Sequence, residues 1–290
     1  MIAVTAASGK LGNLVLERLL KVVPASEIVA IARSPEKLAQ FQARGVKVRR
    51  GDYSALGTLG PSLAGVKRLL LISGMDLGQR VAQHRAVIEA AEAAGVELIV
   101  YTSLLRADVS ALPIAEEHRA TEKLLRASKV PSVLLRNGWY IENYTERLAM
   151  NLARGAFFGA ARDGQIAAAA RADFADAAVA VLTTEGHAGE TYELAGDQPF
   201  TMTDLAKAVS EWAERTISYS DLPAAEYRTA LEKAGVPIAF VDIAVGTDLA
   251  IARGDLNSAS RDLHILIGRD TTTLREVLAN TAKPPANRAA

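Results

Sequence analysis

The sequence predicts an α/β fold with a Rossmann-like, doubly wound and mostly parallel sheet and a smaller, mostly helical C-terminal lobe. The first observation is that short apolar runs alternate with segments of helical periodicity between residues 2 and 136. This alternation is typical of parallel strands that are covered by helices on both faces. The second observation is that the chain opens with an apolar strand, a turn of small residues and a helix. Dinucleotide-binding sheets begin in this way.

Each element follows from a local pattern. The expected strands are short apolar or alternating runs, and they cover residues 2–4, 27–32, 46–50, 68–72, 96–101, 132–136 and 190–194. The expected helices have apolar residues three and four positions apart, and they cover residues 11–22, 79–94, 115–128, 143–153 and 173–184. Ser34 and Pro35 predict the N-cap and first position of another helix. From residue 201 we expect mostly helix, with a short strand at 216–219.

This pattern suggests two parts. Residues 1–138 are expected to form the nucleotide-binding domain, with a return segment near 166–196. Residues 139–290 are expected to form mainly a substrate-binding lobe. Because ligands of doubly wound sheets lie at the carboxyl ends of the strands, we look for site residues there.

The first strand-to-helix turn is a candidate pyrophosphate site. The first amides of a helix lack partners within the helix and carry partial positive charge, so small residues there let a phosphate approach. The candidate residues are Ala6, Ala7, Ser8, Gly9, Lys10 and Leu11. The pattern departs from the fingerprint G-x-x-G-x-x-G, because Ala6 replaces the first glycine. An L-residue resists positive φ, so we expect altered loop geometry or cofactor affinity. A tight turn that binds nothing is the alternative.

The end of the second strand predicts the choice of cofactor. No acidic residue occupies positions 30–34, where NAD sites place Asp or Glu on the ribose hydroxyl, and Arg33 lies there instead. An arginine suits the 2′-phosphate of NADP, although a surface arginine can also be inert. Asp52 is a candidate for the adenine edge or a simple turn residue. The small residues Ser73 and Gly74 after the fourth strand would let the nicotinamide ribose pass, and Met75 beside them is a further candidate cofactor residue.

The catalytic residues cannot be assigned from the sequence. No tyrosine has a lysine four residues later, so the Tyr-x-x-x-Lys pair that protonates carbonyl oxygens in short-chain dehydrogenases is absent. The helix expected at 115–128 carries His118 and Glu122 on one face instead. That pair is either a surface hydrogen bond or a catalytic dyad. Tyr140 and His118 are therefore the two candidate proton donors.

Composition excludes several classes of protein. The 290 residues hold 33 basic and 33 acidic side chains, so nothing indicates a nucleic-acid or membrane-surface partner. The absence of cysteine excludes disulfides, thiolate catalysis and iron–sulfur clusters. The histidines have no metal-ligand spacing, and no apolar run reaches the length of a membrane span. We therefore expect a cytoplasmic protein without a metal. Assembly into a homo-oligomer is compatible with the sequence.

Several motifs together resemble a known family. They are Arg33-Ser34-Pro35-Glu36-Lys37, Leu69-Leu70-Leu71-Ile72-Ser73, Tyr101-Thr102-Ser103-Leu104-Leu105, the run from Leu135 to Tyr144, Arg171-Ala172-Asp173 and Tyr192-Glu193-Leu194-Ala195-Gly196. With the phosphate turn, they resemble the NmrA-like atypical short-chain dehydrogenases, most closely the bacterial type-2 NADPH:quinone oxidoreductases. The resemblance implies that NADPH binds at the Gly9 turn, Arg33, Ser73 and the 138–143 loop, near Arg171. The loop residues are Gly138, Trp139, Tyr140, Ile141, Glu142 and Asn143.

The resemblance implies flavin-free, NADPH-dependent reduction of quinones by hydride transfer from the nicotinamide. A quinone is a strong electrophile, so orientation over the nicotinamide can replace much of the work of a proton donor. Five aromatic residues could either stack against such a ring or form the ordinary core of the smaller lobe: Trp139, Tyr140, Phe157, Phe158 and Phe240. The alternatives are reduction of triphenylmethane or azo dyes and a non-catalytic NADP-sensing regulator of NmrA type.

Overall fold

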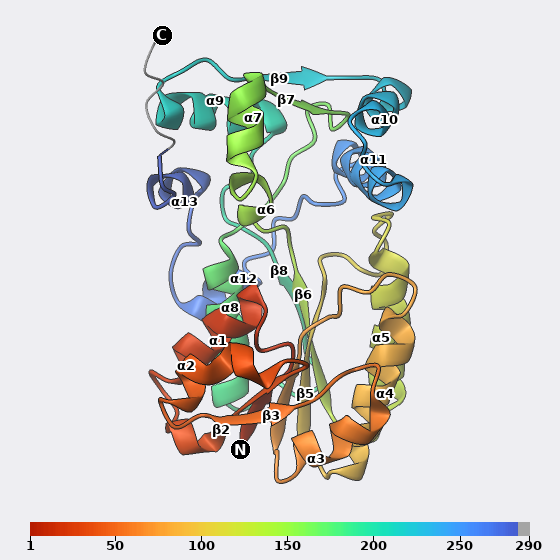
Figure 1. Cartoon of the computed structure of the whole chain (residues 1–290), viewed down its shortest axis with the longest axis vertical. Helices are drawn as coiled ribbons and strands as arrows, with labels where there is room; N and C mark the ends of the chain where they lie inside the picture. The colour runs from red at the N-terminus through yellow and green to blue at the C-terminus, as the bar shows by residue number, and fades with distance from the viewer. Residues whose placement is uncertain (284–290) are drawn as a thin grey trace.

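The protein is built on a parallel sheet of seven strands (Figure 1). The computed structural model describes residues 1–283, so residues 284–290 of the expected smaller lobe lie outside the described part. The strand order is β3-β2-β1-β4-β5-β6-β8, and every neighbouring pair is parallel. The strands are β1 (Ile2–Val4), β2 (Ile28–Ala32), β3 (Lys47–Arg50), β4 (Arg68–Leu71), β5 (Leu98–Leu104), β6 (Ser132–Asn137) and β8 (Thr191–Leu194). The predicted Rossmann-like fold is confirmed.

Helices cover both faces of this sheet. On one face lie α1 (Lys10–Leu19), α2 (Ala39–Gln42), α8 (Arg171–Thr183) and α12 (Asp262–Ile267). On the other lie α3 (Leu59–Leu63), α4 (Arg80–Ala93) and α5 (Ala115–Ala127). This double cover explains why β2 is apolar and buried along its whole length. Short 3-10 turns at Ala25–Glu27, Pro35–Leu38 and Leu56–Thr58 complete this half.

The strand order reverses beside β1. Since β1 pairs with β2 on one side and β4 on the other, the connections leave in opposite directions at the carboxyl end of β1. A crevice at such a point is the usual ligand site of an open α/β sheet. The site therefore belongs at the ends of β1, β2 and β4.

Helices and a small second sheet lie beyond the carboxyl ends of the main strands (Figure 1). The helices are α6 (Glu142–Thr145), α7 (Leu148–Arg154), α9 (Met202–Ala213), α10 (Ala224–Lys233), α11 (Ile238–Ala252) and α13 (Leu274–Ala279). The small sheet is a parallel pair of β7 (Ala156–Gly159) and β9 (Ser218–Asp221). A separate apolar cluster, which includes Leu152, Phe157, Leu205 and Ile251, packs this region together.

The middle of the chain returns to the main sheet. Helix α8 packs against α1, and β8 extends the sheet beyond β6. These elements come from the 166–196 segment, so a part of the chain after residue 139 contributes to the core of the first half.

Four local predictions were wrong. The helix expected at 143–153 is divided into α6 and α7, because the chain turns at Glu146 and Arg147. Strand β7 was not among the expected strands, and it forms because β9 supplies hydrogen-bonding partners far along the chain. Strand β5 continues to Leu104, beyond the expected end at residue 101. The Ser34 side chain caps no helix, and Pro35 begins a 3-10 turn.

Candidate cofactor and active site

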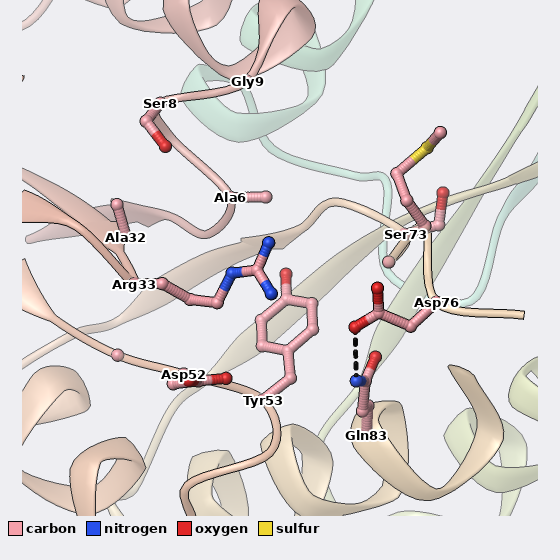
Figure 2. A pocket seen from close by; sticks show the side chains of 13 residues that line it. Ala6, Ser8, Gly9, Ala32, Arg33, Asp52, Tyr53, Ser73, Asp76 and Gln83 are labelled. Atoms are coloured by element: carbon pink, nitrogen blue, oxygen red, sulfur yellow. Dashed lines mark hydrogen bonds between the residues drawn. The ribbon is translucent and has the colours of Figure 1, made fainter. Parts of the chain in front are cut away.

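A pocket lies at the carboxyl ends of β1 to β4 (Figure 2). It brings together predicted cofactor residues from four separate stretches, namely Ala6, Ser8, Gly9, Arg33, Asp52, Ser73, Gly74 and Met75. The rest of the lining is Ala32, Gly51, Tyr53, Asp76 and Gln83. The pocket thus lies at the reversal of strand order, where the fold places its ligand crevice.

The turn before helix α1 lies so close to Gly12 that no residue larger than glycine fits at this position. A Cβ on Gly12 would lie 2.6 Å from the carbonyl oxygen of Ala6 and 2.7 Å from Cα of Ala7. Gly9 is the N-cap of α1 and supplies no side-chain cap, so the first amides of the helix face outward. Asn13 holds the turn from behind, because its Nδ2 donates to the carbonyl oxygens of Ala7 and Gly9 at 2.8 and 3.1 Å. This geometry suits a pyrophosphate.

Ala6 adopts the left-handed backbone conformation, with φ of 46°. This is the conformation that the fingerprint glycine would supply without strain. The turn therefore keeps the geometry expected of a glycine although an alanine is present. The cost is local strain, and the Ala6 side chain lines the pocket.

Arg33 follows β2 directly and points across the pocket toward Tyr53 (Figure 2). Among residues 1–283 the Arg33 guanidinium has no acidic side chain within salt-bridge distance. An exposed guanidinium without an internal partner is suited to an external phosphate.

Tyr53 is a pocket residue that the sequence prediction missed. Its hydroxyl lies 2.5 Å from Oγ1 of Thr5 and 2.8 Å from the carbonyl oxygen of Ile72, which ties the end of β3 to β1 and β4. Burial raises the pKa of the Tyr53 hydroxyl far above its usual value. Its position after β3 was the signal that could have found it. Asp76 and Gln83 were also missed, since they follow β4 on a loop and a helix with no recognisable motif.

The predicted 138–143 loop lies elsewhere: it leaves the end of β6, and its last two residues begin α6. The rings of Tyr140 and Phe174 pack in a T-shaped arrangement with their centroids 5.1 Å apart. The Cζ atom of Arg171 lies over the Tyr140 ring, 5.0 Å from its centroid. Glu142 accepts hydrogen bonds from the backbone N–H of Arg171 at 2.9 Å and so caps α8. Trp139 packs instead on the separate apolar cluster that includes Leu152 and Phe157. None of these residues lines the pocket of Figure 2, so their role toward the nicotinamide stays a prediction.

Glu146 joins the phosphate turn to this loop. Its carboxylate pairs with Nζ of Lys10 at 2.5 Å and with the Arg171 guanidinium at 2.9 Å. Although partial burial acts in the opposite direction, these two cations hold the pKa of Glu146 below its usual value. The predicted residues Lys10 and Arg171 therefore meet at one carboxylate. The predicted residues Ala7 and Leu11 are buried in the core and can offer only their backbone.

His118 and Glu122, which we expected to form either a surface hydrogen bond or a catalytic dyad, do not pair with each other. Both side chains are buried, and each has another partner. Nδ1 of His118 lies 2.8 Å from the Tyr101 hydroxyl, and Glu122 accepts from Ser103 and from Nε of Arg136. The prediction was wrong because the polar face of α5 packs against the sheet. Burial, together with the charge of Arg80, lowers the pKa of His118 to about 3.

Tyr140 is not activated as an acid. Its hydroxyl accepts a long hydrogen bond of 3.3 Å from Nδ2 of Asn137, and burial raises its pKa. Of the expected aromatic walls, Phe157 belongs to the core, whereas Phe158 and Phe240 are exposed. Neither of the two proton-donor candidates, Tyr140 and His118, is therefore placed as a strong acid.

One cluster of described residues has metal-like spacing, formed by Asp197, His264 and Asp270. Asp197 already accepts from the backbone N–H of Thr271 at 2.8 Å and lies 3.0 Å from the Arg261 guanidinium. The Arg261 guanidinium supplies the opposite charge to Asp197, and the absence of a metal stays a prediction.

The fold and the pocket define a Rossmann-type, dinucleotide-binding protein. Residues 6–185 match the family of NAD(P)H-binding proteins. Quinone oxidoreductase 2 of Escherichia coli K12 is 47% identical over 280 residues, which is 97% of this chain and 98% of that protein. The chain belongs to this NAD(P)H-binding family, and the resemblance to the NADPH:quinone oxidoreductases is confirmed.

Solved structures agree with this assignment. The NADPH complex of the quinone oxidoreductase QOR2 of E. coli superposes with a TM-score of 0.94, and 97% of this chain matches 99% of that one. Triphenylmethane reductase of Citrobacter sp., complexed with NADP(H), is 38% identical with a TM-score of 0.91, over 97% of this chain and all of the other. No helix among residues 1–283 is both long and apolar enough to cross a membrane.

Proposed function

We propose that the protein is a flavin-free, NADPH-dependent quinone oxidoreductase. The observation that carries this proposal is the 47% identity, over nearly the full length, to quinone oxidoreductase 2 of E. coli. The free guanidinium of Arg33 in the pocket supports NADPH rather than NADH. A cytoplasmic location and an assembly of identical subunits stay predictions.

The residues present fit a dinucleotide. The outward amides after Gly9 would hold the pyrophosphate, and Arg33 would bind the 2′-phosphate. The stretch from Ser73 to Met75 would lie along a ribose, since it forms the opposite wall of the pocket. The 138–143 loop, which Glu142 fastens to α8, would position the nicotinamide.

When bound, NADPH would supply the hydride that converts the quinone to its hydroquinone anion. The chain contributes position more than proton chemistry, because Tyr140 has a raised pKa and His118 is buried away from the pocket. The product phenolate is delocalised, so water can protonate it after the hydride has moved. Orientation of two bound reactants can account for a large part of such a rate.

Oxidation of NADPH by the purified protein tests the proposal. With 1,4-benzoquinone we expect steady turnover and an absorbance spectrum of the protein without stoichiometric flavin bands. Turnover that requires added flavin would contradict the direct hydride transfer.

The 38% identity to triphenylmethane reductase makes dye reduction the second candidate. Malachite green and an azo dye therefore belong in the same assay. A non-catalytic sensor would give no turnover with any acceptor and would bind NADP⁺ more tightly than NADPH. The ratio of kcat/KM for quinone and dye decides between the two enzymatic functions.

A further inference from the structure

One wall of the cofactor pocket is a loop with little support of its own. Residues 73–79, named here the Gly74 loop, lie between β4 and α4 without regular structure over residues 73–76. Met75 is 87% exposed and Leu77 is 45% exposed, so apolar packing does not hold the loop. A segment of this kind is expected to open easily unless polar contacts restrain it.

Three buried side chains of α4 supply the contacts at Gly74 and Asp76, while Thr102 and Glu117 accept the backbone N–H groups of Ser73 and Gly78. Nε2 of His84 accepts the backbone N–H of Gly74 at 3.0 Å, and Nε of Arg80 donates to the Gly74 carbonyl oxygen at 2.8 Å. Nε2 of Gln83 donates to Asp76 at 2.9 Å, the bond drawn in Figure 2. The N–H and the carbonyl of one pocket residue, Gly74, are thus both held from one helix.

Helix α5 fixes the orientation of the His84 ring. Because Nε2 accepts from Gly74, the proton of the neutral ring is on Nδ1, which lies 3.0 Å from Oγ1 of Thr121. The Thr121 hydroxyl donates to the carbonyl oxygen of Glu117, and Glu117 pairs with Arg80 at 2.9 Å. His84 has no solvent exposure, so it cannot exchange these partners for water.

We propose that His84 is a positioning residue for NADPH, which fixes the Gly74 loop as a wall of the cofactor pocket without touching the reacting atoms. The inference rests on the proposed function only in taking NADPH as the occupant of the pocket. Loss of the His84 acceptor leaves the Gly74 N–H without its partner and loosens the loop at the residue that lines the pocket. The effect should fall on cofactor binding and not on the hydride step.

Two substitutions separate this role from simple burial. The side-chain oxygen in His84→Gln can reach about as far as Nε2, whereas in His84→Asn it reaches only about as far as Nδ1, toward Thr121. The readout is the dissociation constant of NADPH from its fluorescence, without quinone. We expect His84→Asn to weaken NADPH binding about tenfold, as loss of a buried hydrogen bond would. His84→Gln should stay within about twofold of the unaltered protein on the same reasoning.

Tyr101→Phe is the matched control. Tyr101 is buried next to His84, with ring centroids 5.4 Å apart, but its hydroxyl contacts His118 and not the pocket. The Tyr101→Phe substitution should lower Tm and leave NADPH binding unchanged. With saturating NADPH, kcat for the quinone should be nearly the same in all of these variants. Amide hydrogen exchange of residues 73–79 should quicken in His84→Asn and not in His84→Gln.

The outcomes are distinguishable. Unchanged NADPH binding in His84→Asn, or equal weakening in both His84 variants, would overturn the inference. If His84→Asn does not fold, Arg80→Met releases the Gly74 carbonyl instead and should weaken NADPH binding in the same direction; unchanged binding there would also overturn it. Failure of quinone turnover with intact NADPH binding would affect only the proposed function.

Discussion

Ala6 holds a backbone conformation that an alanine rarely adopts, at the turn proposed to bind the pyrophosphate. A left-handed L-residue costs roughly 1–2 kcal/mol, and a glycine recovers much of this although it loses more entropy on folding. Ala6→Gly should therefore raise the free energy of unfolding by about 0.5–1 kcal/mol, measured from the urea midpoint. Ala7→Gly is the control: Ala7 is fully buried without positive φ, so the same change should destabilise.

The position of Arg33 in the pocket predicts a preference for NADPH over NADH. A charge-assisted contact to phosphate contributes roughly 1.5–3 kcal/mol, so NADPH should exceed NADH by about ten- to a hundredfold in kcat/KM. Arg33→Ala should remove most of that preference and leave the use of NADH unchanged. Lys37→Ala, which deletes an exposed cation close by outside the pocket lining, should leave the preference intact. Equal use of both cofactors by the unaltered protein would refute this role.

At the scale of elements, the loop between β6 and α6 predicts how catalysis depends on position. Tyr140→Phe removes a hydroxyl that accepts a long hydrogen bond of 3.3 Å from Asn137. We expect less than about a tenfold loss of quinone turnover, because loss of a general acid typically costs ~10²–10⁴-fold. Unactivated ketones should be poor substrates for the same reason. A thousandfold loss of kcat with NADPH binding intact would reveal a proton donor at this loop.

The elements also show how far a sequence can predict this site. The ends of β1, β2 and β4 were predictable, because a strand, a turn and a helix leave local patterns, and Arg33 and Ser73 follow from where the strands stop. His84 and Gln83 were not, since their function depends on which way α4 faces the Gly74 loop. Strand β7 was missed for the same kind of reason, as each of its residues pairs with a β9 residue 62 positions later in the sequence.

At the scale of the whole molecule, buried ionisable groups set the response to acid. Burial, with Arg80 adding to it, lowers the pKa of both His84 and His118 to about 3. Burial, with Asp221 adding to it, raises the pKa of Asp248 to about 6. A depressed histidine contributes stability above its unfolded pKa of about 6.5, and this is lost as the pH falls. Asp248 has the opposite sign: its cost above pH 6 disappears as it binds a proton.

The two effects do not cancel. Between pH 7 and pH 5, each histidine should remove about 2 kcal/mol from the free energy of unfolding, and Asp248 should return about 1 kcal/mol. The net loss of about 2–3 kcal/mol is measurable by urea unfolding at the two pH values. His118→Gln should reduce the loss by about 2 kcal/mol, whereas Asp248→Asn should increase it and stabilise the protein at pH 8. Equal stability at pH 7 and pH 5 would mean that these histidines gain access to water in the folded state.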